Sequence, residues 1–275
     1  MPKITFEGNS PVPHETLLAN IGHAKGLGLP YVKDSPPHGR RLAVVGGGPS
    51  VLSHLDELRS WGGDIWAING ACPLLKGHGI ESTLFSLDPL PVIAKHAASA
   101  SSAIVCSRCD PAVFEALKGA DVQLFDVVQD DGEGIWASCS TALSVFDLAT
   151  NMGYREIVFF GCEGSFEEKT HAYMDDPQTF RFVVACGGRE YLTLPEMYVQ
   201  TEPLALLLRT FPAHFSERCG GLLRAMVENE EHEIVKVSRA LLAGLKPANQ
   251  DRFDEMADFY GPDWAESQRK HWVAA

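Results

Sequence analysis

Residues 41–51 read RLAVVGGGPSV, a short apolar run that leads into a glycine-rich turn. The run ends at Val45, three glycines, a proline and a serine follow, and the next residues form an amphipathic segment. Glycine lets backbone amides approach an anion closely, and Pro49 suits the first turn of a helix, where no amide proton is needed. The stretch predicts a buried strand, a turn able to bind a phosphate, and then a helix. A plain strand-to-helix turn is the alternative.

Five similar apolar runs follow along the chain. They lie at residues 64–70, 82–88, 102–107, 122–128 and 156–162. Such runs are typical of strands buried on both faces of a mostly parallel sheet. Segments with helical period occur between them, at residues 50–62, 110–120 and 139–153. Strands that alternate with helices predict an α/β fold with a Rossmann-like, doubly wound, mostly parallel sheet.

The chain divides into three regions by sequence pattern. Residues 1–40 are rich in proline around one helical stretch, and we expect them to form an N-terminal extension. We expect residues 41–246 to form the main domain. Within it, residues 165–182 are polar and irregular, as an active-site loop would be. Residues 194–211 then resume a helical period. Residues 247–275 are expected to form a C-terminal helical tail.

Composition limits the partners that the chain is expected to bind. The net charge of −13 over 275 residues repels phosphate backbones and anionic membranes, which disfavours a broad nucleic-acid surface. A local basic groove, and with it a modified nucleic-acid base as acceptor, stays open. The arginines that could build such a groove are Arg40, Arg41, Arg181, Arg189, Arg218 and Arg224.

The sequence also predicts where the protein resides. No apolar run approaches 18 residues, and the first residues lack the layout of a signal peptide, so we expect a cytoplasmic protein without membrane insertion. Seven cysteines, an odd number, suit reduced thiols better than a disulfide framework. The oligomeric state is left open.

Ligands of open parallel sheets bind beyond the carboxyl ends of the strands. The residues directly after each apolar run are therefore the candidates for a binding site. The first run is followed by a possible phosphate-binding turn, the second by an Asn-Gly pair, the third by an acid and the sixth by another glycine turn. These candidates are Gly46, Gly47, Gly48, Pro49, Ser50, Asn69, Gly70, Asp88, Gly161 and Glu163.

Each polar candidate has a functional and a structural interpretation. Asn69 could read a base, a ribose or a sugar, or simply form an Asn-Gly turn. Asp88 could bind a divalent cation or a sugar hydroxyl, or cap a turn before a proline. Glu163 could share a metal with Asp88 or hydrogen-bond an acceptor, or be a solvated acid.

Two further candidates lie outside these strand ends. His171, in the loop stretch KTHAY, is suited to act as a general base or to steady a leaving phosphate, and a solvated histidine is the alternative. Ser140 and Thr141 precede a helix, where they could hold a second phosphate or cap the helix.

The glycine turn does not match two common nucleotide-binding motifs. Val51 stands where the third glycine of the dinucleotide fingerprint belongs, and no Gly-Lys-Ser/Thr follows as in a P-loop. A dehydrogenase is disfavoured on this ground.

Five stretches in order resemble a known superfamily. They are VVGGGPSV, IWAINGACPLLKGHGI, STLFSLDP, SCSTALSVFDLATNMGYREIVFFGCEGSF and THAY, within residues 40–175. This set resembles the 6-hydroxymethylpterin pyrophosphokinase MptE-like superfamily, which is related to the motility accessory factor glycosyltransferases and, more distantly, to bacterial sialyltransferases that use CMP-sialic acid.

The resemblance implies a Rossmann-like, nucleotide-binding transferase. The turn from Gly48 to Ser50 would hold the phosphates of the nucleotide, Asn69 would contact the nucleotide or donor, and Asp88 would lie near a metal or the transferred group. Glu163 departs from the usual Gly-x-Asp pattern, which puts its implied contact and any use of a metal in doubt.

Two chemistries occur among these relatives. One passes a diphosphate from ATP to a hydroxymethyl group with Mg²⁺, and the other passes a sugar from a nucleotide-sugar donor to a hydroxyl. We favour the glycosyltransferase, with His171 as base, because the polar loop supplies that base and the early strand ends lack a dense carboxylate cluster. A non-catalytic nucleotide-binding protein is a third hypothesis.

Overall fold

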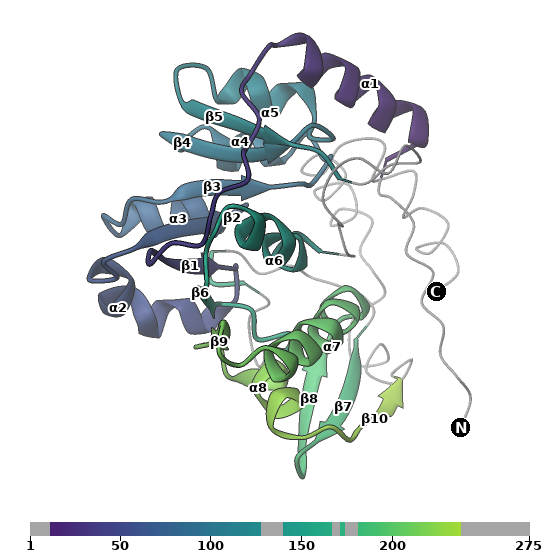
Figure 1. Ribbon diagram of the computed structural model, residues 1–275. Helices are drawn as coiled ribbons and strands as arrows, with labels where there is room; N and C mark the ends of the chain where they lie inside the picture. Colours follow the sequence, from purple (N-terminus) through teal and green to yellow (C-terminus); the bar gives the residue numbers. More distant parts are fainter. Residues whose placement is uncertain (1–11, 128–139, 167–170, 174–180, 238–275) are drawn as a thin grey trace.

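The computed structural model describes residues 12–127, 140–166, 171–173 and 181–237 (Figure 1). Its centre is a seven-stranded sheet in the order β5-β4-β3-β2-β1-β6-β9, with every neighbouring pair parallel. The first six strands are those predicted from the apolar runs, so the expected α/β fold is confirmed. They are β1 (Arg41–Val45), β2 (Asp64–Ile68), β3 (Thr83–Ser86), β4 (Ser102–Cys106), β5 (Asp121–Phe125) and β6 (Glu156–Phe160), and β9 (Phe215–Glu217) completes the sheet.

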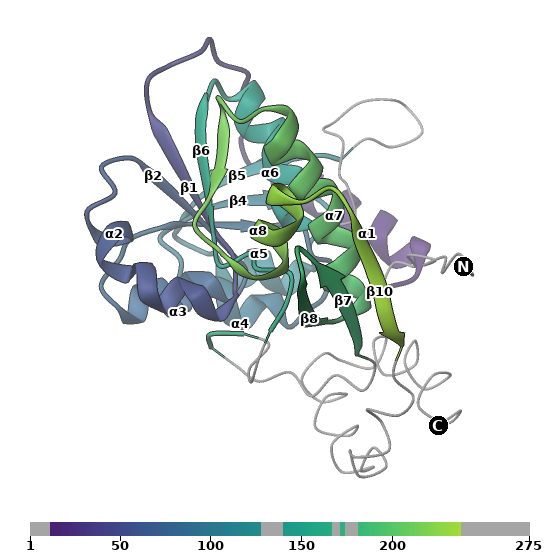
Figure 2. The same cartoon turned by 90° about the horizontal axis from the view of Figure 1, so that it is seen from below.

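Both faces of the sheet are covered, because successive residues of β1 from Leu42 to Val45 are all fully buried. Helices α2, α3 and α4 lie on one side of the sheet, and α6 and α7 lie on the other (Figure 2). The helices are α1 (His14–Gly26), α2 (Leu55–Arg59), α3 (Ala71–Gly77), α4 (Ile93–Ala97), α5 (Pro111–Ala116), α6 (Thr141–Asn151), α7 (Pro195–Thr210) and α8 (Gly221–Glu228).

The path of the chain creates a topological switch point between β1 and β6. From β1 the strands follow one another outward to β5, and the chain then returns past β1 to place β6 on its other side. In open sheets of this kind, ligands bind beyond the carboxyl ends of the strands at such a switch point. The glycine turn of residues 46–48 lies at this point.

The helix predicted after the glycine turn differs in type from the expectation. Residues Pro49–His54 form a 3₁₀ helix, η1, and only Leu55–Arg59 are α-helical. The Ser53 hydroxyl donates to the carbonyl of Ser50 at 2.7 Å, and such side-chain bonds compete with the α-helical ladder. The chain therefore leaves β1 in a tight coil that stays close to the end of β6.

A second, antiparallel sheet was not predicted. It has the order β10-β7-β8 and consists of β7 (Phe182–Cys186), β8 (Arg189–Thr193) and β10 (His232–Val237). A Gly187-Gly188 pair with positive φ at both residues joins β7 to β8, as two-residue hairpin turns require. The polar segment expected to be irregular thus ends in a strand at Phe182, whereas residues 167–170 and 174–180 lie outside the described part.

The N-terminal extension packs on the main domain where it is described. Helix α1 contacts α5, the Val32 amide donates to the carbonyl of Leu124 on β5, and the His38 amide donates to the carbonyl of Gly153. The expected tail of residues 247–275 lies outside the described residues. No helix in the described part is both long and apolar enough to cross a membrane.

Candidate functional site

The predicted residues meet at one edge of the sheet. Strand order places Asp88 after β3, Asn69 and Gly70 after β2, the glycine turn after β1, and Gly161 to Glu163 after β6, so each group neighbours the next. Adjacent strands lie about 4.8 Å apart, so the groups form a row across the switch point. Parallel strands explain this convergence, because their carboxyl ends all face the same edge.

The glycine turn is bonded tightly to the end of β6. The amides of Gly46 and Gly48 donate to the carbonyls of Phe160 and Gly161, both at 2.8 Å. A Cβ on Gly46 would overlap the carbonyl of Gly161, which itself has a φ of +63°. The glycines are therefore needed for the close approach of two backbones.

Glu163 reaches into this turn. Its Oε1 accepts a hydrogen bond from the Ser50 amide, and a Cβ on Gly48 would overlap its Oε2. The residue is only 8% exposed, and burial raises the pKa of its carboxyl, while the Ser50 hydroxyl and amide and His54 act in the opposite direction. A carboxylate of the protein itself thus occupies the place where the sequence predicts a phosphate.

Two polar atoms beside this turn are buried without a hydrogen-bond partner in the described part of the chain. They are the Ser50 hydroxyl oxygen, which lies near the Glu163 carboxylate without hydrogen-bonding geometry, and the Asn69 carbonyl oxygen Oδ1. Asn69 also has a φ of +46°, a conformation that asparagine tolerates better than most residues. Both the turn and the ligand-reading interpretations of Asn69 therefore fit its geometry.

The loop segment His171–Tyr173 lies over the ends of β1 and β2. The Ala172 amide donates to the carbonyl of Gly47 at 2.8 Å. The Tyr173 ring fills the space that side chains on Gly47 and Gly70 would need, and it also packs against the ring of His96 on α4, with centroids 5.9 Å apart. The predicted base His171 is brought to the glycine turn, with its ring centroid 5.3 Å from that of Tyr173.

Asp88 is a partly buried carboxylate at the end of β3. The Leu90 amide donates to its Oδ1 at 3.0 Å, and burial raises its pKa from 3.8 to about 6. The hydrogen bond is the turn cap that the sequence offered as an alternative. The raised pKa also gives this group a proton affinity suited to acid–base chemistry near neutral pH.

The remaining pair caps a helix. The Ser140 hydroxyl accepts a hydrogen bond from the Leu143 amide at 3.2 Å, and Thr141 is the first residue of α6. This bond matches the capping interpretation of Ser140, and the second-phosphate interpretation stays a prediction.

Asp88 and Glu163 do not fit a shared metal. Three strand spacings separate β3 from β6, which puts these two strand ends about 14 Å apart. Among the described residues, no group of three or more His, Cys, Asp or Glu side chains is arranged to hold a metal ion. Any Mg²⁺ at Asp88 would have to be held by that carboxylate together with donor phosphates.

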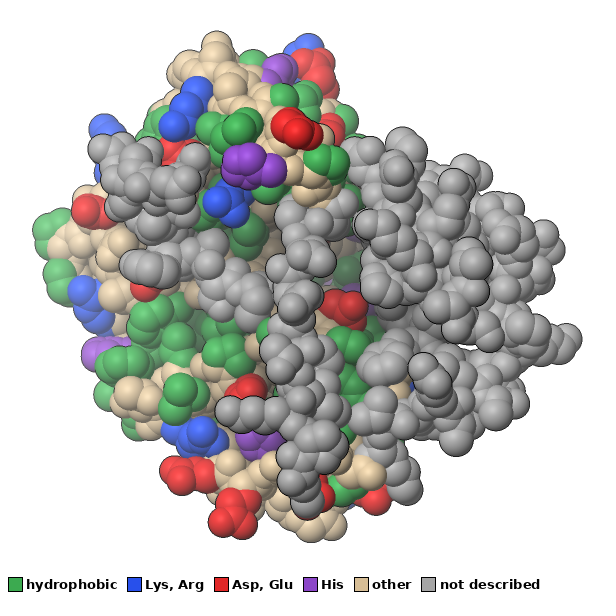
Figure 3. Space-filling model, turned by 90° about the vertical axis from the view of Figure 1, so that its right-hand side faces the viewer, with side chains coloured by type: hydrophobic (Ala, Val, Ile, Leu, Met, Phe, Trp, Pro, Cys, Tyr) green, Lys and Arg blue, Asp and Glu red, His purple; other side chains and the backbone are tan. Residues whose placement is uncertain are grey.

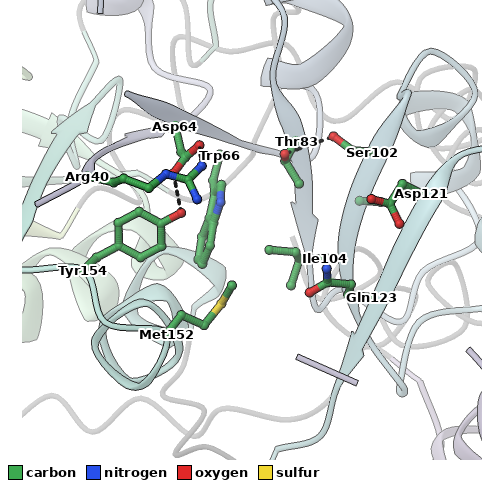
Figure 4. Close-up of a pocket in the computed structure, with 11 residues that line it drawn as sticks. Arg40, Asp64, Trp66, Thr83, Ser102, Ile104, Asp121, Gln123, Met152 and Tyr154 are labelled. Carbon is green, nitrogen blue, oxygen red and sulfur yellow. Dashed lines mark hydrogen bonds and ion pairs between the residues drawn. The ribbon is translucent and has the colours of Figure 1, made fainter. Parts of the chain in front are cut away.

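A cavity of about 150 Å³ lies at the opposite edge of the sheet (Figure 4). Its wall includes Asp64, Thr83, Ser102 and Asp121, which are the first residues of β2, β3, β4 and β5. Asp64 is already bonded, because it accepts from the Tyr154 hydroxyl at 2.5 Å and pairs with Arg40. The cavity is therefore separate from the row of candidate residues, which lie at the carboxyl ends.

Most of the arginines considered for a basic groove are paired with acids. Arg40 pairs with Asp64, Arg41 with Glu156, Arg218 with Glu57 and Arg224 with Glu217. On the described part of the face in Figure 3, Lys and Arg side chains are scattered among acidic and hydrophobic ones. Paired and scattered cations give little support to a nucleic-acid acceptor.

The sequence did not single out His96 and Tyr173. His96 lies in the short helix after Asp88, and burial lowers its pKa, as do Lys95 and His171 nearby. His96 lies ten residues beyond the end of β3, and a lone helical histidine does not stand out by spacing. Comparisons with protein-family models, curated proteins and solved structures found no match. What the site does is therefore inferred from the residues of this chain.

Proposed function

We propose that the chain is a nucleotide-dependent transferase that moves a sugar from a nucleotide-activated donor to an acceptor hydroxyl. The observation that supports this most is the packing of the His171–Tyr173 segment over the glycine turn at the switch point, with Asp88 on the same edge of the sheet two strands away. In open α/β sheets, nucleotides bind beyond the carboxyl ends of the strands at such a switch point.

In this proposal, each candidate residue has its own role in binding or catalysis. The turn around Gly47 and Ser50 holds the donor phosphates, and Asn69 contacts the nucleotide or the sugar. His171 takes the proton of the acceptor hydroxyl as that oxygen attacks the anomeric carbon, and the nucleotide leaves with the bonding electron pair. Asp88 binds a hydroxyl of the transferred sugar through its carboxyl group.

A binding screen tests the nucleotide part of the proposal. The protein is melted with CMP, UDP, ATP, CMP-sugars, UDP-sugars, GDP-sugars and NAD, with and without Mg²⁺, because a ligand of the native state raises Tm by mass action. We expect a rise with one nucleotide sugar and its free nucleotide. A rise with ATP and Mg²⁺ alone would support diphosphate transfer instead, and binding without turnover would support a non-catalytic role.

The variant H171A tests the catalytic part. Loss of a general base lowers kcat by roughly 100-fold or more while the donor dissociation constant changes little. H78A, at an exposed position beyond α3, is the matched control and is expected to keep full activity. Equal rates for H171A and the unmodified protein would remove His171 from the mechanism.

A further inference from the structure

Glu163 occupies the position of an anionic ligand rather than merely lying near it. The Gly46 and Gly48 amides already donate to carbonyls at the end of β6, those of Phe160 and Gly161. The Val51 amide donates to the carbonyl of Gly48. Pro49 has no amide proton. The Ser50 amide is thus the donor of this turn that meets an anion, and the anion that it meets is the Glu163 carboxylate.

The surroundings fix the backbone of Glu163 but leave the site around its carboxylate incompletely satisfied. The Leu223 amide at the start of α8 donates to the Glu163 carbonyl at 2.8 Å. The Ser50 hydroxyl stays buried without a hydrogen-bond partner in the described residues, and the Gly47 amide has no hydrogen bond there either. If the carboxylate moved away, the Ser50 amide and the buried Ser50 hydroxyl beside it would be released to a phosphate oxygen.

We propose that Glu163 is a specificity-determining residue that competes with the ligand's phosphate for the glycine turn, and that binding requires its carboxylate to leave the Ser50 amide. This inference rests on the proposed function for the identity of the ligand, but not for the competition itself. Two anions about 3–4 Å apart repel each other strongly in a partly buried site, so carboxylate and phosphate do not share one amide.

The competition depends on pH. The titratable groups around the carboxylate are His54 on η1, Cys219 after β9, Cys162 beside it and His171 above Gly47. Because burial raises the pKa of Glu163, its carboxyl takes up a proton more readily as pH falls, and a neutral carboxyl repels a phosphate less. Anion binding is therefore expected to tighten at lower pH.

The test compares the full chain with E163Q and E163A, using inorganic pyrophosphate as the probe in calorimetry. At pH 8 both variants are expected to bind pyrophosphate at least tenfold more tightly than the unmodified protein. On lowering the pH to 6, the ratio between the unmodified protein and E163Q is expected to shrink. Protonation of the probe itself affects both proteins equally and leaves that ratio unchanged.

E217Q is the matched control. Glu217 at the end of β9 is also a shielded carboxylate that accepts from turn amides, those of Cys219 and Gly220, but it lies outside the glycine turn. Its replacement is expected to leave pyrophosphate affinity unchanged. Equal gains in E217Q and E163Q would overturn the proposal by tracing the effect to overall charge.

The remaining outcomes are also decisive. Unchanged or weaker pyrophosphate binding by E163Q and E163A, or no binding by any of the proteins, overturns the competition. If the variants gain pyrophosphate affinity and no nucleotide binds, the competition stands and the proposed transferase function fails. If nucleotides bind the unmodified protein and the variants show no gain, the function stands and the competition fails.

Discussion

At the scale of single residues, burial raises the pKa of Asp88 above its ordinary value. Its carboxyl is shielded by the fold and has one amide donor, from Leu90, to offset the loss of water. A folded-state pKa of about 6, above the ordinary value of 3.8, means that the native state holds the proton more tightly than the unfolded chain does. Asp88 therefore lowers the stability of the protein at neutral pH.

The variant D88N tests whether the ionised Asp88 carboxylate lowers the stability of the fold. Stability from protonated Asp88 is fully present below about pH 4 and is lost as pH rises through about 6, so D88N is expected to stabilise the protein at pH 8 and have little effect at pH 4. The shift corresponds to about 3 kcal/mol at most, or roughly 5–10 °C in Tm for a chain of this size. Thermal melts at both pH values measure it.

Two features make the D88N comparison specific. The amide oxygen introduced by D88N can still accept the hydrogen bond from Leu90, so the turn is kept. D121N, at an exposed strand start, controls for the removal of one negative charge. A fall in Tm at pH 8 would mean that the ionised carboxylate stabilises the fold, contrary to this account.

At the scale of elements, the His171–Tyr173 segment is held by what lies beneath it. The Tyr173 ring occupies the space that a side chain at Gly70 would take, and the Ala172 amide donates a hydrogen bond to the carbonyl of Gly47. Gly70 has an ordinary negative φ of −64°, so alanine there brings no backbone strain. Its Cβ would nevertheless overlap the Tyr173 ring.

The variant G70A is therefore expected to lift the segment from the sheet edge. Hydrogen exchange at the Ala172 amide should speed up at least tenfold, while Tm changes by only a few degrees. G77A in the same helix α3 is the control, because a Cβ at Gly77 would meet no atom within 4 Å. Unchanged exchange in G70A would show that Tyr173 does not hold the segment in place.

At the scale of the whole molecule, the continuous apolar runs were enough to predict the parallel sheet. Strands buried on both faces, such as β1, cannot alternate with polar residues, so their sequences stand out. The β7–β8 hairpin was missed because β7 begins where a polar segment that indicated a loop ends. An apolar pattern likewise does not reveal the 3₁₀ form of η1, in which the Ser53 hydroxyl bonds to the Ser50 carbonyl.

The residues of the candidate site could be predicted from the sequence, but their positions relative to one another could not. Residues after strand ends could be collected from the sequence, because all parallel strands end at one edge. Their spacing along that edge depends on strand order, which the sequence pattern does not encode. The pairing of Asp88 with Glu163 on a metal was therefore conceivable from sequence, whereas three strand spacings now separate them. The insertion of Glu163 into the glycine turn likewise depends on β6 lying beside β1.

The central claim is that a nucleotide binds at the carboxyl edge of the sheet, at the switch point between β1 and β6. Backbone amide chemical shifts of the labelled protein, followed by NMR during titration with the nucleotide that raises Tm, test it most directly. We predict the largest shifts at Gly47, Ser50, Asn69 and Gly161. Shifts confined to Trp66, Gln123 and Tyr154, around the cavity at the amino edge, or no shifts at all, would contradict it.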